Sequence, residues 1–307
     1  MKLAPIVLFV YNRPFHTQQT VEALRNNDFA GESNLFVFSD APKDETAKDK
    51  VGNVRDYIKN LDGFKSVTVV ERDKNFGLAK SIIAGVTDVV NQYGKIIVLE
   101  DDIVTSPFFL RYMNDGLNFY KDNKEIFTIS GYNHPPTLMK FPKRYKEDVY
   151  FNYRNFSWGW ATWADRWEKA DWEVKDFNSF LKDKKAQKRF NRGGDDLTPM
   201  LIAQMKGEID SWAIRWSYAH FKNNVLSVCP VYSYVNNIGH DGTGTHCGTS
   251  SVYKNDLSKS KRQCSFIKSI KVNKKVMDAF RKVYQTGSKF SLRKVIKILI
   301  MYDLWKK

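Results

Sequence analysis

The sequence has few cysteines and no long apolar run. Cys229, Cys247 and Cys264 form neither a paired framework nor a CxxC pattern, which argues against a disulfide-stapled fold and a cysteine-rich zinc site. No stretch approaches the roughly 18 uninterrupted apolar residues of a membrane-spanning helix. The chain also lacks a GxGxxG turn after its first apolar segment and a Walker A sequence. A nucleotide would therefore have to be held by other groups.

A charge excess is absent from most of the chain. Residues 1–100 carry 13 Lys/Arg against 13 Asp/Glu, and residues 101–250 carry 20 against 18, whereas residues 251–307 carry 16 against 3. The aromatic residues are concentrated in the neutral middle region rather than among the basic ones, which argues against a nucleic-acid-binding groove. With 42% apolar residues over 307 positions, the chain can form a packed core.

The first 130 residues alternate apolar, β-branched segments with amphipathic ones. Strands are predicted over residues 5–11, 34–40, 66–72 and 95–101, and helices over residues 17–27, 49–61 and 78–94. This alternation predicts an α/β fold with a mostly parallel sheet covered on both faces by helices. No linker precedes the tryptophan-rich residues 131–254. We expect one domain over residues 1–254, with halves at 1–130 and 131–254, and a basic helical region over 255–307.

The four predicted strands all end in polar residues, which read YNRP, SDAP, ERDKNFG and EDD. The carboxyl ends of parallel strands share one edge of a sheet, and ligands bind there. The last of these ends is the most unusual, because the adjacent carboxylates of Glu100, Asp101 and Asp102 repel one another. A solvated surface turn is one interpretation. The other is a site for Mn²⁺ or Mg²⁺, which would neutralise a bound diphosphate.

In their order and spacing, the segments VLFVYNRP, FSD, RDKNFGLAKSI and IIVLEDDIVTSPFFLRYM resemble the nucleotide-sugar half of a GT-A fold glycosyltransferase. The resemblance covers residues 3–250 and extends to bacterial family 2-like enzymes and to the family of the Golgi N-acetylglucosaminyltransferase I, which has a comparable E-D-D. It implies a Rossmann-like GT-A domain. It also implies a metal-dependent, inverting transfer of a sugar from a nucleotide diphosphate, expected to be UDP, to a glycan.

The resemblance also implies which residues contact the donor. Glu100 and Asp101 would face sugar and ribose hydroxyls, and Asp102 would ligate the metal. Trp158 and Trp160, separated by one glycine, either present a flat apolar face to a sugar or belong to the core. The other expected donor contacts are Tyr11, Arg13, Asp40, Arg72, Asn75, Gly77 and Lys80.

Later residues supply the remaining chemistry. Asp210, in GEIDSWAIRW, is the expected catalytic base that takes the proton of the acceptor hydroxyl, and a helix N-cap is the alternative. The related motif can carry two adjacent acids, whereas Ser211 follows Asp210 here. In the loop NIGHDGTGTH, His246 is the expected metal ligand or diphosphate contact, and His240 and Asp241 are second choices.

Residues 288–307 carry 6 Lys/Arg and one Asp, and at the helical period their apolar side chains share one face. Such a helix either lies on an anionic membrane or docks on the domain. The first alternative implies a lipid-linked acceptor in surface polysaccharide assembly and a cytoplasmic protein that is peripheral on the inner face of the cell membrane. Two rival functions are a sugar-nucleotide pyrophosphorylase, whose glycine-rich signature is absent, and a non-catalytic glycan-binding or membrane-adaptor protein.

Overall fold

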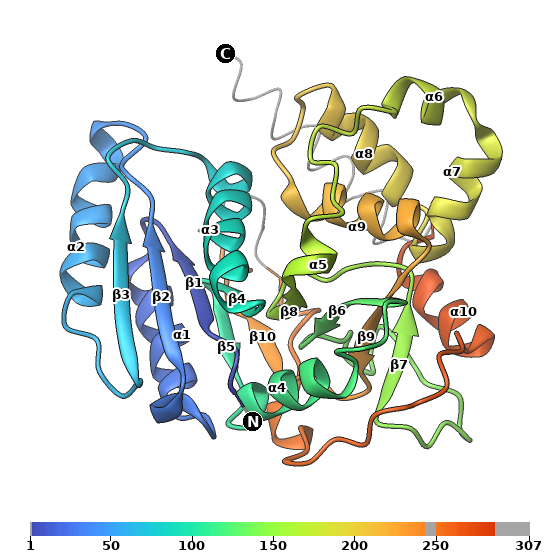
Figure 1. The fold of residues 1–307 in the computed structure, drawn as a ribbon, viewed down its shortest axis with the longest axis horizontal. Helices are drawn as coiled ribbons and strands as arrows, with labels where there is room; N and C mark the ends of the chain where they lie inside the picture. The colour runs from blue at the N-terminus through green and yellow to red at the C-terminus, as the bar shows by residue number, and fades with distance from the viewer. Residues whose placement is uncertain (1, 243–249, 286–307) are drawn as a thin grey trace.

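The computed structural model describes residues 2–242 and 250–285 of the chain. Within them the main sheet has eight strands in the order β3-β2-β1-β4-β8-β6-β9-β7, with helices on both faces (Figure 1). The strands are β1 (Ile6–Val10), β2 (Asn34–Ser39), β3 (Ser66–Glu71), β4 (Lys95–Glu100), β6 (Ile126–Ser130), β7 (Val149–Asn152), β8 (Trp160–Trp163) and β9 (Leu226–Pro230).

Strand direction divides this sheet into two parts. β1 pairs in parallel with β2 and β4, and β2 pairs in parallel with β3. Beyond β4, the strand β8 runs antiparallel to both of its neighbours, β6 and β9 run parallel to each other, and β7 is antiparallel to β9. The sheet is therefore mixed but mostly parallel, which confirms the predicted α/β class.

The helices of the first half begin and end close to the predicted boundaries. α1 (Pro14–Arg25) starts earlier than expected, because proline is favoured in the first helical turn. α2 (Lys48–Ile58) and α3 (Leu78–Tyr93) fall within a few residues of their predicted ranges. α3 ends at Gly94, whose φ of 76° is left-handed and suits a glycine cap.

Strand side chains alternate between two cores, one on each face of the sheet. Ile6 and Leu8 join the core that receives side chains from α1, α2, α4 (Phe109–Phe119) and α10 (Lys274–Val283). Val7 and Phe9 join the core formed with α3, α5 (Ala164–Trp167) and α9 (Trp212–Asn223). The remaining helices are α6 (Phe177–Lys182), α7 (Lys184–Phe190) and α8 (Leu197–Met205), with 3₁₀ turns at Ala30–Glu32, Glu45–Ala47, Asn191–Gly193 and Leu257–Lys259.

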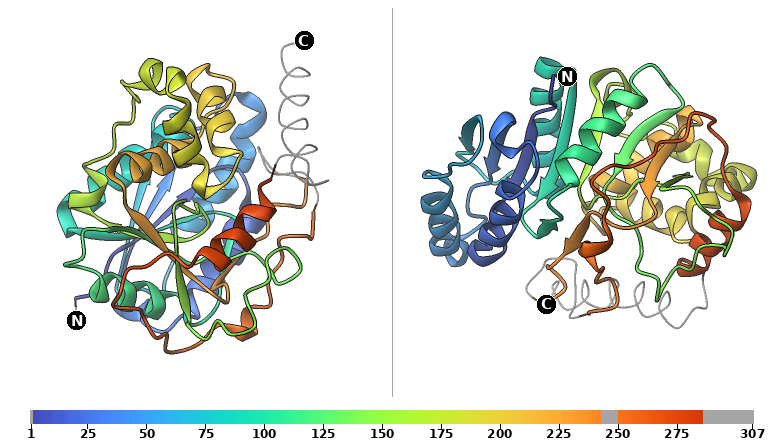
Figure 2. Two further views of the ribbon diagram at one scale, coloured as in Figure 1. Left: turned by 90° about the vertical axis from the view of Figure 1, so that its right-hand side faces the viewer. Right: turned by 90° about the horizontal axis from the view of Figure 1, so that it is seen from below.

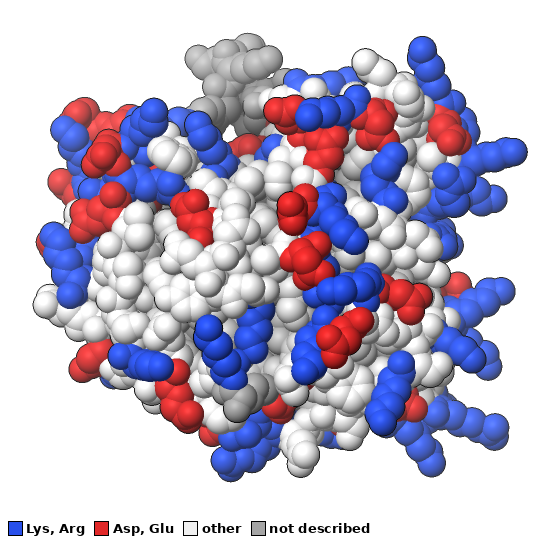
Figure 3. All heavy atoms as spheres, viewed as in Figure 1, with Lys and Arg blue, Asp and Glu red and all other residues white. Residues whose placement is uncertain are grey.

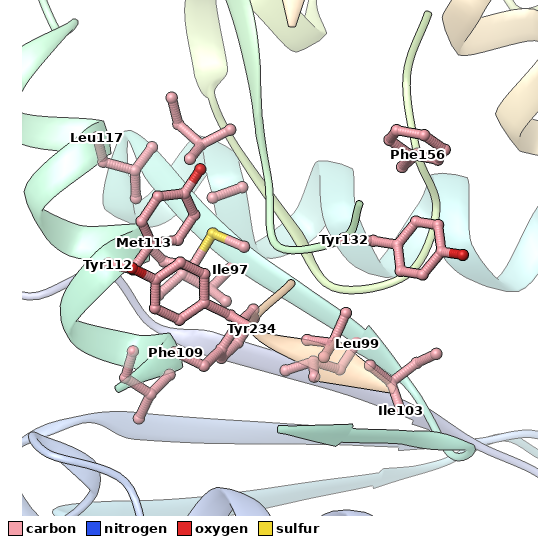
Figure 4. Packing of buried hydrophobic residues seen from close by; sticks show 14 of the residues in the cluster. Ile97, Leu99, Ile103, Phe109, Tyr112, Met113, Leu117, Tyr132, Phe156 and Tyr234 are labelled. Carbon is pink, nitrogen blue, oxygen red and sulfur yellow. The ribbon is translucent and has the colours of Figure 1, made fainter. Parts of the chain in front are cut away.

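A second, two-stranded sheet continues directly from the acidic motif. β5 (Ile103–Thr105) pairs antiparallel with β10 (Val235–Asn237), so that Ile103 lies opposite Asn237. Tyr112 of α4 stacks on Tyr234, with 4.3 Å between ring centroids, and fixes the start of β10 (Figure 4). A segment from late in the chain is thereby held beside the carboxyl end of β4.

The described part of the predicted basic region packs on the rest of the fold. Phe280 of α10 is fully buried in the main core. The Tyr284 hydroxyl forms a hydrogen bond with His134 Nε2 at 2.9 Å. Figures 1 and 2 show α10 lying against the second half of the sheet. The domain boundary at residue 254 stays a prediction, and the helix expected over residues 288–307 lies outside the described residues. Where the structure describes the chain, no helix is both long and apolar enough to cross a bilayer.

Candidate active site

Four strand ends meet at one edge of the main sheet. Phe9 of β1 lies opposite Glu100 of β4, and Ser39 of β2 lies opposite Glu71 of β3. Because these strands are parallel, the polar segments that follow them all leave the sheet on the same side. This edge therefore gathers the groups that the strand pattern predicted to converge.

Arg13 and the acidic motif form the centre of this edge. Arg13 Nη1 lies 3.0 Å from Asp102 Oδ2 and 3.8 Å from Asp101 Oδ1. The backbone N–H of Tyr11 donates to the Asp101 carboxylate, and Thr20 Oγ1 donates to the Asp101 carbonyl oxygen at 2.8 Å. One guanidinium thus faces two adjacent carboxylates, both on side chains that are mostly buried.

The protonation of the acidic motif is strongly shifted. Burial raises the pKa of Glu100 to about 8, the negative charges of Asp102 and Asp101 add to this, and a hydrogen bond from the Trp212 side chain opposes it. Burial and then the charge of Asp102 raise the pKa of Asp101 to about 7, although Arg13 acts in the opposite direction. Burial is thus the larger cause and repulsion between the carboxylates the second, and a cation bound beside Asp102 would favour the charged form of both acids.

This shift predicts a pH-dependent stability. In the unfolded chain Glu100 titrates near 4.5, so between that pH and about 8 the folded protein holds a proton that the unfolded chain has released. The free energy of unfolding should therefore fall as pH rises through this window. Glu100→Gln should make that decline shallower, in denaturant titrations at pH 5 and pH 8 without added metal. Glu173→Gln, whose side chain is 78% exposed, is the control; equal slopes in wild type and Glu100→Gln would contradict the prediction.

The last residue of β10 and the residues that follow it cover Asp102 from the other side. Ile238 N–H donates to the Asp102 carbonyl oxygen at 2.9 Å, and Asn237 Nδ2 lies 3.4 Å from Asp102 Oδ1. A Cβ at Gly239 would lie only 2.1 Å from Asp102 Oδ2, so no side chain fits there. The pairing of β5 with β10 brings these residues to Asp102. Sequence patterns did not predict this pairing.

Asp40 holds the loop between β3 and α3. Its carboxylate is buried and accepts hydrogen bonds from the backbone N–H groups of Ala41, Phe76 and Gly77, at 2.9 to 3.0 Å. Asn75 Nδ2 donates to the Ala41 carbonyl oxygen at 2.7 Å and ties the same loop to the segment that follows β2. Any contact from Asp40 to a bound nucleotide would compete with these hydrogen bonds. In the structure this acid fixes the conformation of the loop.

The other residues expected at the donor surround the same loop. The Arg72 guanidinium lies 4.2 Å from the centroid of the Phe76 ring, and Lys80 Nζ lies 5.1 Å from it. The Tyr11 hydroxyl accepts a hydrogen bond from the backbone N–H of Lys43 at 3.0 Å. Two cations thus lie against the loop that follows β3, and a tyrosine contacts the segment that follows β2; their contacts with a nucleotide stay predictions.

Asp210 lies at the amino end of α3. Its Oδ2 accepts a hydrogen bond from Ala79 N–H at 3.3 Å, and the N-cap of its own helix α9 is the next residue, Ser211. The side chain is exposed, and the helix terminus favours a negative charge beside it. Trp212, two residues on, contacts Glu100, which brings Asp210 to the edge of the acidic motif.

Two other candidates have different outcomes. Trp160 is fully buried, and its ring stacks on Trp212 at 4.9 Å and on Trp167 at 5.6 Å. It therefore does not fit the expected donor contact: these rings cover it, and it supports Trp212 from within the core, the second of the two interpretations open from the sequence. His246, the expected metal or diphosphate contact, lies outside the described residues.

The described residues contain no ready-made metal cage. Within residues 2–242 and 250–285, no three His, Cys, Asp or Glu side chains are arranged to hold a metal ion on their own. A surface hollow of about 510 Å³, lined by Lys2, Glu32, Lys65 and Tyr93 among others, lies at the opposite edge of the sheet. Its lining includes one acid, Glu32, and no pair of carboxylates, so the carboxyl edge with Arg13 and Asp102 is the better candidate site.

Solved structures match the chain at low sequence identity. The S. aureus TarS 1–349 structure aligns with 12% identity and a TM-score of 0.40, over 75% of this chain and 59% of that one. A longer S. aureus TarS structure gives 13% and 0.41, over 75% and 36%. The mannosyltransferase PcManGT from Pyrobaculum calidifontis, in complex with GDP-Man and Mn²⁺, gives 12% and 0.38, over 71% and 74%. The chain thus spans 59% and 36% of the two TarS chains.

Sequence comparison identifies the family directly. A comparison with curated protein sequences finds no match. The model of the GNT-I family, in contrast, matches residues 1–192, which is more than half of the chain and includes the strand ends, the acidic motif and the first part of the tryptophan-rich residues. The chain therefore belongs to the GNT-I family, a family of GT-A glycosyltransferases.

Proposed function

We propose that the chain transfers a sugar from a nucleotide diphosphate donor to a glycan acceptor, with the help of a divalent cation and with inversion at the sugar. The observation that carries the proposal is the cluster of Arg13, Asp101 and Asp102 at the carboxyl edge of a parallel sheet, in a chain of the GNT-I family. Such an edge is where α/β folds bind nucleotides.

Asp102 would hold the cation, Mn²⁺ or Mg²⁺. The fit rests on the groups present, because Asp101 and Asp102 offer two adjacent, mostly buried carboxylates that share the guanidinium of Arg13, at 3.8 and 3.0 Å. Hard cations are commonly held by one or two carboxylates, with substrate oxygens and water as the other ligands, so the absence of a three-residue cage among the described residues is compatible with this role. When bound, the cation would balance the charge of the leaving diphosphate.

The chain's own residues would orient and activate the reactants. Arg13, Arg72 and Lys80 supply positive charge along the strand ends, and Glu100, held by Trp212, would accept a hydrogen bond from the donor sugar. Asp210 would take the proton from the acceptor hydroxyl as that oxygen attacks the sugar. The Asp210 carboxylate is exposed and lies at the amino end of α3, which supports this role.

UDP is the proposed nucleotide, and a lipid-linked glycan of surface polysaccharide assembly is the proposed acceptor. An anionic membrane on the cytoplasmic side would then be a partner. The proposed membrane contact is supported by the positive charge of residues 251–307. It is also supported by five exposed lysines on α7 and α10, which are Lys184, Lys185, Lys188, Lys274 and Lys275. Figure 3 shows basic side chains projecting along the edge that carries these helices in Figure 1.

One experiment tests both parts of the proposal. The purified chain is incubated with Mn²⁺ and a panel of UDP-, GDP- and dTDP-sugars, with and without anionic vesicles. Slow hydrolysis of one donor class, suppressed by EDTA, is expected, together with co-sedimentation of the protein with vesicles. Neither binding nor hydrolysis of any nucleotide sugar would contradict the transferase. Hydrolysis of a nucleotide sugar without vesicle binding would support the transferase activity and refute the proposed membrane contact.

A further inference from the structure

We infer that Asp241 is a positioning residue, which holds the covering segment, residues 237–241, against Asp102 through contacts with Arg13 and His16. The inference rests on the proposed function, because it assigns Asp241 a task at the same site. The sequence suggested Asp241 as a second choice for direct contact with metal or diphosphate. In the structure its carboxylate is aimed at two basic side chains instead.

The contacts of Asp241 come from the start of α1. His16 Nε2 lies 2.9 Å from Asp241 Oδ2, and Arg13 Nη2 lies 3.7 Å from Asp241 Oδ1. The His16 side chain is 8% exposed and that of Arg13 is 13% exposed, whereas that of Asp241 is 42% exposed. A partly exposed acid of the covering segment thus reaches two mostly buried groups of the nucleotide-binding half.

Arg13 connects this contact to the acidic motif. Its Nη1 faces Asp102 at 3.0 Å while its Nη2 faces Asp241 at 3.7 Å. A guanidinium is planar and presents its donors in a fixed fork, so it can hold two carboxylates in a defined relation, which a lysine cannot. Moving Asp241 therefore changes the position of the group that neutralises Asp102.

Gly239 shows how closely the covering segment is held. It is buried, its N–H donates to Asn237 Oδ1 at 2.8 Å, and a Cβ on it would collide with Asp102 Oδ2 and lie 2.9 Å from Arg13 Nη1. On the other side, the His240 ring packs edge-on against Trp158, with 5.4 Å between centroids. Backbone contact, aromatic packing and the Asp241 ion pairs all fix the same five residues over the acidic motif.

A double-mutant cycle tests the inference. The four proteins are wild type, His16→Ala, Asp241→Ala and the double variant, and the readouts are the Kd for UDP in the presence of MnCl₂ and the free energy of unfolding. We expect each single variant to weaken UDP binding by roughly 10-fold and the double variant to be no weaker than the worse single one, because both changes release the same contact. Asp256→Ala, an exposed acid that caps a 3₁₀ turn, is the control and should bind like wild type.

Gly239→Ala provides an independent variant that leaves both ion-pair partners in place. Its methyl group would push the covering segment off Asp102, so UDP binding should weaken as in Asp241→Ala. Multiplicative losses in the cycle, or unchanged binding in Asp241→Ala, would overturn the inference. A wild-type protein that binds no UDP would refute the choice of UDP, and one that binds none of UDP, GDP and dTDP would refute the proposed function instead. The contact itself would then be judged by the unfolding free energies alone, where additive effects of His16→Ala and Asp241→Ala would refute it too.

Discussion

Asp102→Ala should abolish metal-dependent nucleotide binding while leaving the fold intact. The Asp102 carboxylate contributes the oxygens proposed to hold the cation, and its loss leaves Arg13 facing Asp101 and Asp241. We expect the affinity for UDP in the presence of Mn²⁺ to fall by about 100-fold or more, because removal of groups that only support a metal ligand already costs about 10- to 100-fold. Isothermal titration of UDP with and without Mn²⁺ measures this directly.

The control for this prediction is the neighbouring acid. Glu100→Ala should leave Mn²⁺-dependent UDP binding nearly unchanged, because Glu100 accepts a hydrogen bond from the Trp212 side chain and is proposed to face the sugar rather than the cation. Its effect should appear in the rate of transfer or in the preference among donor sugars. Equal losses of UDP affinity in Asp102→Ala and Glu100→Ala would refute the division of roles within the motif, and full UDP binding in Asp102→Ala would remove Asp102 from the metal site.

Asp210→Asn should reduce kcat by about 100- to 10,000-fold with little change in donor affinity, since general base catalysis contributes about that much. The asparagine side chain keeps an oxygen that can accept the hydrogen bond from Ala79 N–H, so the amino end of α3 should stay capped. The loss would then report on proton transfer and not on the position of α3. Single-turnover rates with the donor and acceptor identified in the nucleotide-sugar screen measure it.

Ser211 offers a matched control, because it is adjacent and caps α9 through its bond with Ile214 N–H. Ser211→Ala should cost about 1 kcal/mol of stability, as the loss of a helix cap does, and should leave kcat close to that of wild type. If Ser211→Ala lost as much activity as Asp210→Asn, the effect of Asp210 would be one of local structure. Retained turnover in Asp210→Asn would remove Asp210 from the base role.

The sequence predicted the first half of the fold well for a physical reason. β1 and β4 are buried almost throughout, and β2 largely so, so each is a short apolar run, whereas the edge strand β3 is partly exposed and alternates instead. An amphipathic helix follows each of β1, β2 and β3. Parallel strands must end at one edge, so the approach of Arg13 to Asp101 and Asp102 follows from the order of the elements alone. These are local patterns combined with one topological rule.

The contacts that cover the acidic motif could not be predicted in the same way. The pairing of β5 with β10 joins residues about 130 positions apart, and both strands have only three residues. His16 reads as one polar residue of a helix until Asp241 is placed beside it. Trp160 was undecided for a related reason, because a tryptophan on a short strand looks the same whether its face meets Trp212 or a ligand.

The acidic motif occupies the step between two sheets. β4 ends at Glu100 and β5 begins at Ile103, so Asp101 and Asp102 are the only residues between a strand of the main sheet and a strand of the small one. With both flanking residues paired in register, these two carboxylates have little freedom to reorient. Their conformational entropy is lost when the chain folds, not when a ligand arrives, and such preorganisation strengthens binding without adding a contact.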